Sequence, residues 1–186
     1  MDRYLYLEEK ERRYRENKFK YFVPNRHQKR FLGKTATCDE LLFAGGNRTG
    51  KSTTGALGVT AWATGRYPSW WTGRRFDTPV RILVMGQTDV QLRKAAQRVL
   101  MGEEGQWGTG MLPKDTITDD KGKQTVYMKH DPRGCIDYIQ VKSDFGGYSY
   151  IYFGTYGQGA EAQQGDELHA IWCDEPVDDD VYGELV

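Results

Sequence analysis

The chain has 186 residues, and its 26 Lys and Arg balance its 26 Asp and Glu, so that the formal net charge at pH 7 is zero. This length suits one domain with a hydrophobic core, and no apolar run approaches the ~20 residues that a membrane-spanning helix needs. The charged N-terminus excludes a signal peptide, and the neutral charge balance argues against a protein that coats DNA. The three scattered cysteines (Cys38, Cys135, Cys173) favour reduced thiols in a cytosolic protein over a disulfide frame or a zinc site.

The charge is unevenly spread along the chain. Residues 1–34 carry eleven Lys or Arg against five acids, a net charge of +6, whereas residues 156–186 carry nine acids and no base, a net charge of −9. The basic segment fits contact with nucleic acid or with an acidic neighbour, and a solvated helix face explains it equally well.

The first elements are helical. Residues 2–20 predict a charged helix with scattered aromatic side chains, and residues 21–24 predict an extended segment. Asn25 follows Pro24 and predicts the N-cap of a short helix that runs to Leu32.

A phosphate-binding loop is the strongest signal in the sequence. The residues Gly45-Gly46-Asn47-Arg48-Thr49-Gly50-Lys51-Ser52 fit the pattern G-x-x-x-x-G-K-[ST]. The apolar run 41–44 predicts a buried strand before the loop, and residues 52–64 predict a helix after it. Backbone amides of such a loop surround the phosphates of a nucleotide at a positive helix end. Lys51 then adds a charge for the β and γ phosphates, the Ser52 hydroxyl is suited to Mg2+, and Thr53 continues the site into the helix.

The middle of the chain alternates between a loop, a strand and a helix. Residues 65–73 predict a turn-rich aromatic loop, in which we expect Trp70 and Trp71 to pack the loop onto the sheet rather than to stack on bases. Residues 80–85 predict a second buried strand. Residues 88–101 predict an amphipathic helix with a capping-box pattern at Thr88 and Gln91.

The last third of the chain predicts strands. Residues 124–129, 136–142 and 148–155 have strand patterns, and the last two flank a hairpin-like turn at residues 145–147. Residues 168–173 predict a buried strand with Asp174 and Glu175 at its carboxyl end, the edge at which α/β sheets collect ligands. Asp174 is suited to hold Mg2+, and Glu175 is suited to orient and deprotonate an attacking water. An acidic turn after a strand is the simpler interpretation of the pair alone.

These elements predict an α/β fold with a mainly parallel central sheet flanked by helices and an inserted antiparallel ribbon. The extra strand and the adjacent Glu175 resemble the ASCE class of three-layer P-loop ATPases, which includes helicases and packaging motors.

Several connecting segments resemble the N-terminal ATPase half of the large terminase subunit of tailed phages. These segments are Val23-Pro24-Asn25-Arg26-His27-Gln28, residues 65–76, Tyr156-Gly157-Gln158-Gly159, Gln164-Gly165 and Ile171-Trp172-Cys173-Asp174-Glu175-Pro176. The resemblance covers nearly all of residues 20–180. It implies an ATP-hydrolysing motor with Mg2+ as cofactor.

The resemblance also implies roles for two further side chains. Gln28 would read adenine, although from the residues alone it completes the helix cap at Asn25. Arg48 would sense or stabilise the γ-phosphate and would act in catalysis together with Lys51 and Glu175. Relatives place this arginine at the position of Asn47, so a solvent-facing Arg48 at the loop tip remains an equal alternative. Arg93, Arg98 and Arg133 are candidates for an arginine that acts on a neighbouring subunit.

The domain organisation follows from the same resemblance. We expect a charged helix over residues 1–20 and a P-loop ATPase domain over residues 21–186, cut short before the coupling element and the nuclease domain of a full large terminase. Nuclease activity is therefore expected of the parent protein and not of this fragment.

The implied partners are double-stranded DNA, the portal protein of the procapsid and a small terminase subunit. The working form would be a homo-oligomeric ring, and a monomer in isolation is the alternative. The protein would act in the host cytoplasm and transiently at the portal vertex, and it would not associate with a membrane. Two other functions stay open: a helicase-like or recombinase-like ATPase that acts on nucleic acid, and a nucleotide-binding module without turnover.

Overall fold

The structure is a computed structural model that describes residues 3–46, 48–129, 135–158, 167–177 and 183. Asn47 and Arg133, which the sequence analysis names, lie outside the described residues, and so does most of the segment 157–165 that carries part of the resemblance. None of the described helices is long and apolar enough to cross a membrane.

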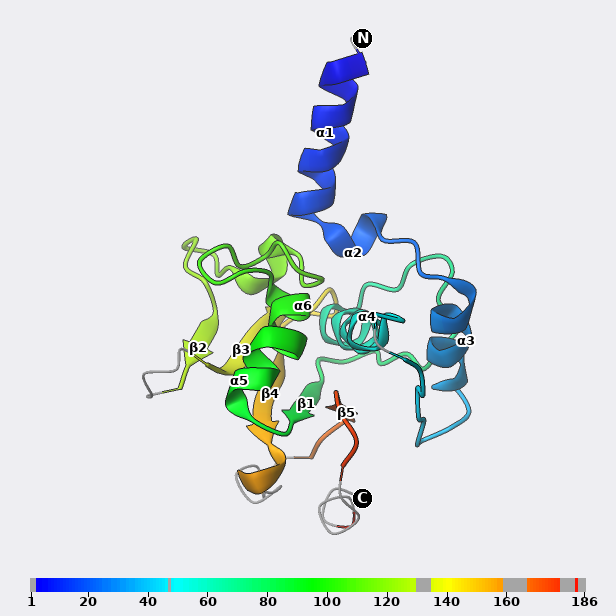
Figure 1. Ribbon diagram of the computed structural model, residues 1–186. Coiled ribbons are helices and arrows are strands. Elements are labelled where there is room, and N and C mark those ends of the chain that lie inside the picture. Colours follow the sequence, from blue (N-terminus) through cyan, green and yellow to red (C-terminus); the bar gives the residue numbers. More distant parts are fainter. Residues whose placement is uncertain (1–2, 47, 130–134, 159–166, 178–182, 184–186) are drawn as a thin grey trace.

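Helices come first along the chain and strands dominate its second half (Figure 1). The elements are α1 (Arg3–Glu16), α2 (Lys18–Tyr21), α3 (Arg26–Lys34), α4 (Lys51–Thr64), β1 (Arg81–Gly86), α5 (Asp89–Leu92), the π-helical turn η1 (Arg93–Gln97), α6 (Arg98–Met101), the 3-10 turn η2 (Lys114–Ile117), β2 (Val126–Met128), β3 (Ile136–Lys142), β4 (Tyr148–Thr155), the 3-10 turn η3 (Tyr156–Gln158) and β5 (Ala170–Cys173).

The five strands form one mixed sheet in the order β2-β3-β4-β1-β5. β1 lies parallel to β4 on one side and to β5 on the other, whereas β2, β3 and β4 pair antiparallel. The expected antiparallel ribbon is confirmed, but the prediction of a mainly parallel sheet is wrong. The ribbon joins the sheet directly through β4, so that half of the pairings are antiparallel.

The described helices that contact the sheet pack on one face of it. Ile82 and Val84 of β1 point to this face and belong to the same core cluster as Leu57 of α4 and Leu92 of α5. Trp172 of β5 lies on the same face, because β1 and β5 pair with Val84 opposite Trp172. These described helices form one helical layer against the sheet.

The predicted strand at residues 41–44 is absent, and this prediction is wrong. The segment has no strand partner among the described residues, and Leu42 is 87% exposed. The ring of Phe43 lies 4.9 Å from that of Phe31, so the run packs on α3 instead of the sheet. A short apolar run predicts burial, but it cannot specify which element provides it.

The charged N-terminus forms two helices instead of one. The side chain of Asn17 accepts a hydrogen bond from the backbone N–H of Lys20 and thus starts α2 as a new helix. α1 projects away from the rest of the molecule (Figure 1) and buries none of its residues. Its arginines form ion pairs with glutamates one turn away, such as Arg13 with Glu9 at 2.6 Å, so the charges of α1 lie on an exposed helix surface.

The aromatic loop after α4 packs as predicted, but on α4 rather than on the sheet. Trp71 is 3% exposed, and its ring lies 6.2 Å from that of Trp62 in an edge-to-face arrangement. The indole N–H groups of both tryptophans donate to the carbonyl of Arg74. These contacts fix the loop as structural support for the helix that follows the phosphate-binding pattern.

Candidate functional site

The glycine-rich loop ends where α4 begins, at Lys51. Gly50 has a φ of 88° and Arg48 a φ of 64°, both in the left-handed region, which only glycine adopts without strain. The loop reverses direction there, so that the first N–H groups of the 14-residue helix α4 lie at its base. A helix start of this kind favours an anionic ligand.

Lys51 folds back over the loop. Its Nζ donates to the carbonyl oxygens of Gly45 at 2.9 Å and Gly46 at 3.1 Å. The Thr49 hydroxyl donates to the same Gly46 carbonyl at 2.8 Å. The ammonium group therefore lies above the loop backbone, in reach of a phosphate that the loop would hold.

The structure brings Ser52 and Asp174 together across 122 residues of sequence. The Ser52 hydroxyl donates to Oδ2 of Asp174 at 3.2 Å. Oδ1 of Asp174 is buried and has no hydrogen-bond partner among the described residues. Burial raises the pKa of Asp174 and is the largest effect on it, whereas the hydrogen bond from Ser52 lowers the pKa. A buried carboxylate oxygen without a donor, next to a hydroxyl, suits a hard divalent cation such as Mg2+.

Glu175 is fixed through its backbone. The hydroxyl of Tyr156, the first residue of η3 after β4, donates to the carbonyl oxygen of Glu175 at 2.8 Å. The N–H of Asp174 donates to the carbonyl of Met85 at 3.0 Å. Burial, the largest effect, raises the pKa of Tyr156 far above its usual range, so the hydroxyl stays protonated and can donate a hydrogen bond. Sequence reasoning missed this role of Tyr156, although the residue lies in a segment that carries the resemblance.

Gln28 caps α3 in the way that the residues alone predict. Asn25 accepts from the Gln28 backbone N–H at 3.0 Å, and Oε1 of Gln28 accepts from the Asn25 N–H at 2.9 Å. The Gln28 amide also donates to the Gly50 carbonyl at 3.3 Å, and the side chain is 4% exposed. Both ends of the carboxamide are thus engaged, and Gln28 ties α3 to the phosphate-binding loop.

The other predicted site residues lie on the same loop. Arg48 is exposed at the loop tip, in the solvent-facing arrangement of the alternative interpretation, and Thr53 is half-buried in the first turn of α4. The structure thus gathers the loop, Ser52, Asp174, Glu175 and Gln28 at one end of the sheet, and it leaves Arg48 at the rim.

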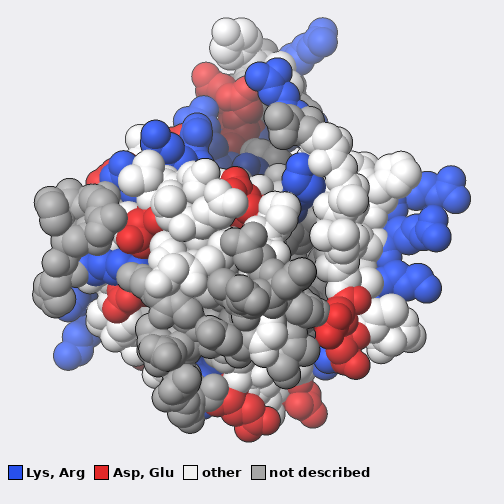
Figure 2. All heavy atoms as spheres, turned by 60° about the horizontal axis from the view of Figure 1, so that its bottom comes forward, with Lys and Arg blue, Asp and Glu red and all other residues white. Residues whose placement is uncertain are grey.

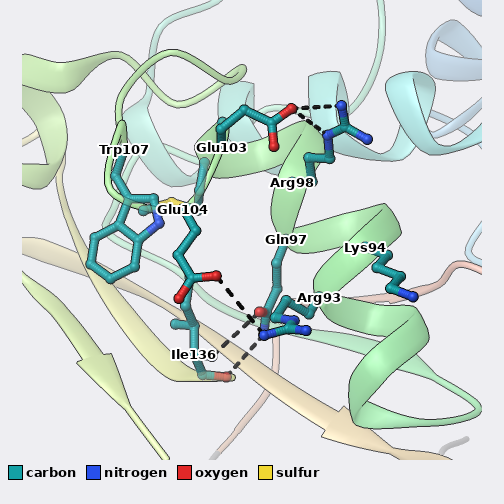
Figure 3. Close-up of a pocket in the computed structure, with 10 residues that line it drawn as sticks. Arg93, Lys94, Gln97, Arg98, Glu103, Glu104, Trp107 and Ile136 are labelled. Carbon is teal, nitrogen blue, oxygen red and sulfur yellow. Dashed lines mark hydrogen bonds and ion pairs between the residues drawn. The ribbon is translucent and has the colours of Figure 1, made fainter. Parts of the chain in front are cut away.

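Two of the three candidate trans-acting arginines line a separate cavity of about 220 Å3 (Figure 3). Arg98 pairs with Glu103 at 2.6 Å and Arg93 with Glu104 at 3.9 Å, and Trp107 lies beside Glu104. The glutamates of the loop after α6 thus neutralise both arginines in this chain.

Basic charge is exposed on α3 as well as on α1. Arg26, Arg30 and Lys34 are exposed, Lys29 is partly exposed, and none of them has an ion-pair partner among the described residues. Figure 2 shows a group of Lys and Arg side chains at the right edge of the molecule, the side on which α3 lies in Figure 1. The N-terminal excess of positive charge therefore presents a patch close to the glycine-rich loop.

Comparisons with known proteins agree with these features. A family model described as the terminase large subunit, T4likevirus-type, N-terminal, matches residues 42–185. The "Terminase, large subunit" of Salmonella phage P22 is 33% identical over an alignment 201 positions long, which covers 97% of this chain and 39% of that relative. The chain thus spans about two fifths of the relative's length. No solved structure gives a significant match.

Proposed function

The chain belongs to the terminase large subunit family, and from this premise we propose that it is the ATP-hydrolysing part of a motor that packages double-stranded phage DNA. The observation that carries the proposal is the contact between Ser52 and Asp174. It joins the start of α4, just after the glycine-rich loop, to the tip of β5. In P-loop ATPases these two positions share a magnesium ion and a nucleotide.

Each residue then has a defined task. The loop amides from Gly45 to Ser52 and the ammonium of Lys51 bind the phosphates. The Arg48 guanidinium would turn inward from the rim of the loop to balance charge on the γ-phosphate. Ser52 and Asp174 would hold Mg2+, which supplies charge neutralisation for the phosphates when it is bound. Glu175 accepts the proton of the attacking water. Gln28 would exchange its bond with Asn25 for adenine, since a carboxamide can donate and accept at once.

The partners of the motor follow from the family and belong to the proposal. They are double-stranded DNA, the portal of the procapsid and a small terminase subunit, with several copies of the chain working as a ring in the host cytoplasm and at the portal vertex. Arg26, Arg30 and Lys34 of α3, which have no ion-pair partner in the part of the chain that the structure describes, are suited to a nucleic-acid backbone.

The direct test is Mg2+-dependent ATP turnover over a series of protein concentrations, with Lys51→Ala and Glu175→Gln beside the wild type. We expect both variants to lose about a hundredfold or more of the turnover, because each removes a group that acts on the reacting phosphate or water. Glu175→Gln should still bind ATP. Lys121→Ala, which changes a lysine of an exposed loop, is the matched control.

The dependence on protein concentration adds a second result. Turnover that rises faster than linearly indicates a site that two copies complete, and proportional turnover places all the groups in one chain. Binding of ATP without hydrolysis, unchanged by Glu175→Gln, would instead support a nucleotide-binding module. Turnover that survives in Glu175→Gln would contradict the assignment of the base.

A further inference from the structure

A small cavity lies beside Glu175, where the tips of β1 and β5 meet the start of α5. Its volume is about 10 Å3, which is close to the space that one water molecule requires. The side chains that line it are two carboxamides, two carboxylates and two apolar groups: Gln87, Gln91, Asp174, Glu175, Leu92 and Ala95. A water in this cavity would thus find both donors and acceptors, which a buried water requires.

The register of the sheet places Gln87 level with Glu175. Met85 of β1 is paired with Cys173 of β5, and the two strands run parallel. Gln87 lies two residues beyond Met85, as Glu175 lies two residues beyond Cys173. The N–H of Asp174 donates to the carbonyl of Met85 and extends this pairing past the end of β5. The two side chains therefore emerge at the same edge of the sheet, on neighbouring strands.

The two glutamines of the cavity differ in what else they do. Oε1 of Gln91 accepts from the Thr88 hydroxyl at 3.1 Å, and its backbone N–H donates to the same hydroxyl at 3.2 Å, so Gln91 closes the N-cap of α5. Gln87 is exposed, and its carboxamide makes no hydrogen bond within the described part of the chain. Gln87 is thus free to bind a ligand of the site, while Gln91 supports the helix.

We propose that the carboxamide of Gln87 holds the attacking water against the carboxylate of Glu175. The proposal rests on the ATP hydrolysis proposed above. In that step the water oxygen forms a bond to the γ-phosphorus, the bond from the γ-phosphorus to the β,γ-bridging oxygen breaks, ADP leaves, and a water proton passes to Glu175. Gln87 takes no proton. Its carboxamide accepts a hydrogen bond from the water or donates one to it.

A glutamine suits this task for two reasons. Its carbonyl can accept from the water while its amide donates to a phosphate oxygen, so that one side chain aligns the two reactants. The group is also neutral, so it fixes the water without competing with Glu175 for the proton. A glutamine orients the attacking water in GTPases by the same chemistry.

The test compares Gln87→Ala with the wild type in two measurements. The first is single-turnover hydrolysis of Mg·ATP. The second is the affinity for Mg·ADP with aluminium fluoride, which imitates the transferring phosphate with its water in place, measured against the affinity for a non-hydrolysable ATP analogue. Gln106→Ala, at another exposed glutamine, is the control, and thermal melts check that both variants fold.

We expect Gln87→Ala to slow hydrolysis about 10- to 1,000-fold, as the loss of one aligned hydrogen-bonding group does. The aluminium fluoride complex should weaken by at least tenfold, whereas the ATP analogue and the melting temperature should not change. An equal change in the affinity for both ligands, or no change in either, would overturn the role of Gln87. A wild type that binds neither ligand would instead refute the proposed ATPase function.

Discussion

The carboxyl group of Asp174 illustrates how a binding residue can oppose the stability of the fold. Burial raises its pKa, and one of its oxygens has no donor among the described residues. Folding therefore favours the neutral acid more than the unfolded chain does, while Mg2+ requires the carboxylate. Under the proposed function, this group would serve its ligand rather than add to the free energy of unfolding.

The replacement Asp174→Asn tests this conflict. Because the pKa is raised in the folded protein, the wild type should lose stability as the pH rises from about 4, the value of an unfolded Asp, through the folded pKa. The Asn variant should lack this decline and melt at an equal or higher temperature than the wild type at pH 7 without metal. With Mg·ATP the order should reverse, since only the wild type gains the ligand's stabilisation.

Thermal melts between pH 4 and pH 7 in a chelator, and again with Mg·ATP, measure both effects. Asp137→Asn, at an exposed position, controls for the loss of one surface charge. A lower melting temperature of Asp174→Asn in the chelator at pH 7 would show that the carboxylate stabilises the fold.

At the scale of elements, the site depends on how closely α4 approaches β5. Gly55 lies in the second turn of α4, and a Cβ atom there would overlap the indole ring of Trp172. Trp172 lies just before Cys173 and Asp174 in the chain, so a shift of its ring moves the tip of β5 relative to Ser52. The absence of a side chain at Gly55 thus helps to set the contact between Ser52 and Asp174.

We predict opposite effects of Ala at two glycines of α4. Helix propensity alone favours Ala over Gly by about 1 kcal/mol at each. At Gly58 the new Cβ would lie 3.3 Å from Leu32 and 3.5 Å from Trp62, so Gly58→Ala should be neutral or stabilising. At Gly55 the overlap should cost about 1–3 kcal/mol, or several degrees in the melting temperature.

Thermal melts and Mg·ATP affinity compare the two variants. Gly55→Ala should lower both quantities, and the smaller ring of Trp172→Phe should restore part of the loss in the double variant. Equal melting temperatures for Gly55→Ala and Gly58→Ala would show that Trp172 adjusts without strain.

The same elements show how far a sequence predicts a fold. The period-two pattern of residues 148–155 predicts β4 with its observed bounds, and the helix at 52–64 begins one residue earlier than predicted. The prediction of a strand at residues 41–44 was wrong, because Phe43 packs on Phe31, a contact that no local pattern encodes. The prediction of a mainly parallel sheet was wrong for the same reason, because the join of the ribbon to β1 is non-local.

The candidate site follows the same division. The loop pattern and the acidic pair predicted Lys51, Ser52 and Asp174, and the structure brings Ser52 and Asp174 together. The contact of Tyr156 with Glu175 was not predicted, and neither was the role proposed for Gln87, since both depend on strand register. The cap at Asn25 and Gln28 was predicted from spacing alone, but the bond from Gln28 to Gly50 was not.

For the whole molecule, the structure separates a compact α/β part from the projecting helix α1. α1 buries no residue, and its ion pairs are exposed and internal to the helix. Exposed ion pairs of this kind contribute about 0–1 kcal/mol. The helix therefore adds little to the free energy of unfolding of the rest of the chain, and its Leu5, Tyr6 and Leu7 are exposed.

Deletion of residues 1–16 should change the melting temperature by no more than about 2–4 °C, the shift that 1 kcal/mol causes in a chain of this size. The affinity for Mg·ATP should stay the same. Differential scanning calorimetry and nucleotide titration measure both. The matched deletion of residues 1–25, which removes Phe19 of the core and the cap of α3, should destabilise the protein clearly. A large loss from the shorter deletion would show that α1 packs on the body in solution.

β5 has a single strand neighbour among the described residues, and this arrangement has a consequence for the kinetics of the site. A strand held along one side opens more easily than a central strand, so its backbone amides should exchange with solvent faster than those of β4. Each opening carries Asp174 and Glu175 away from Ser52. A nucleotide that links α4 to β5 would close this motion and slow the exchange. The ligand would then complete the rigidity of the site that recognises it.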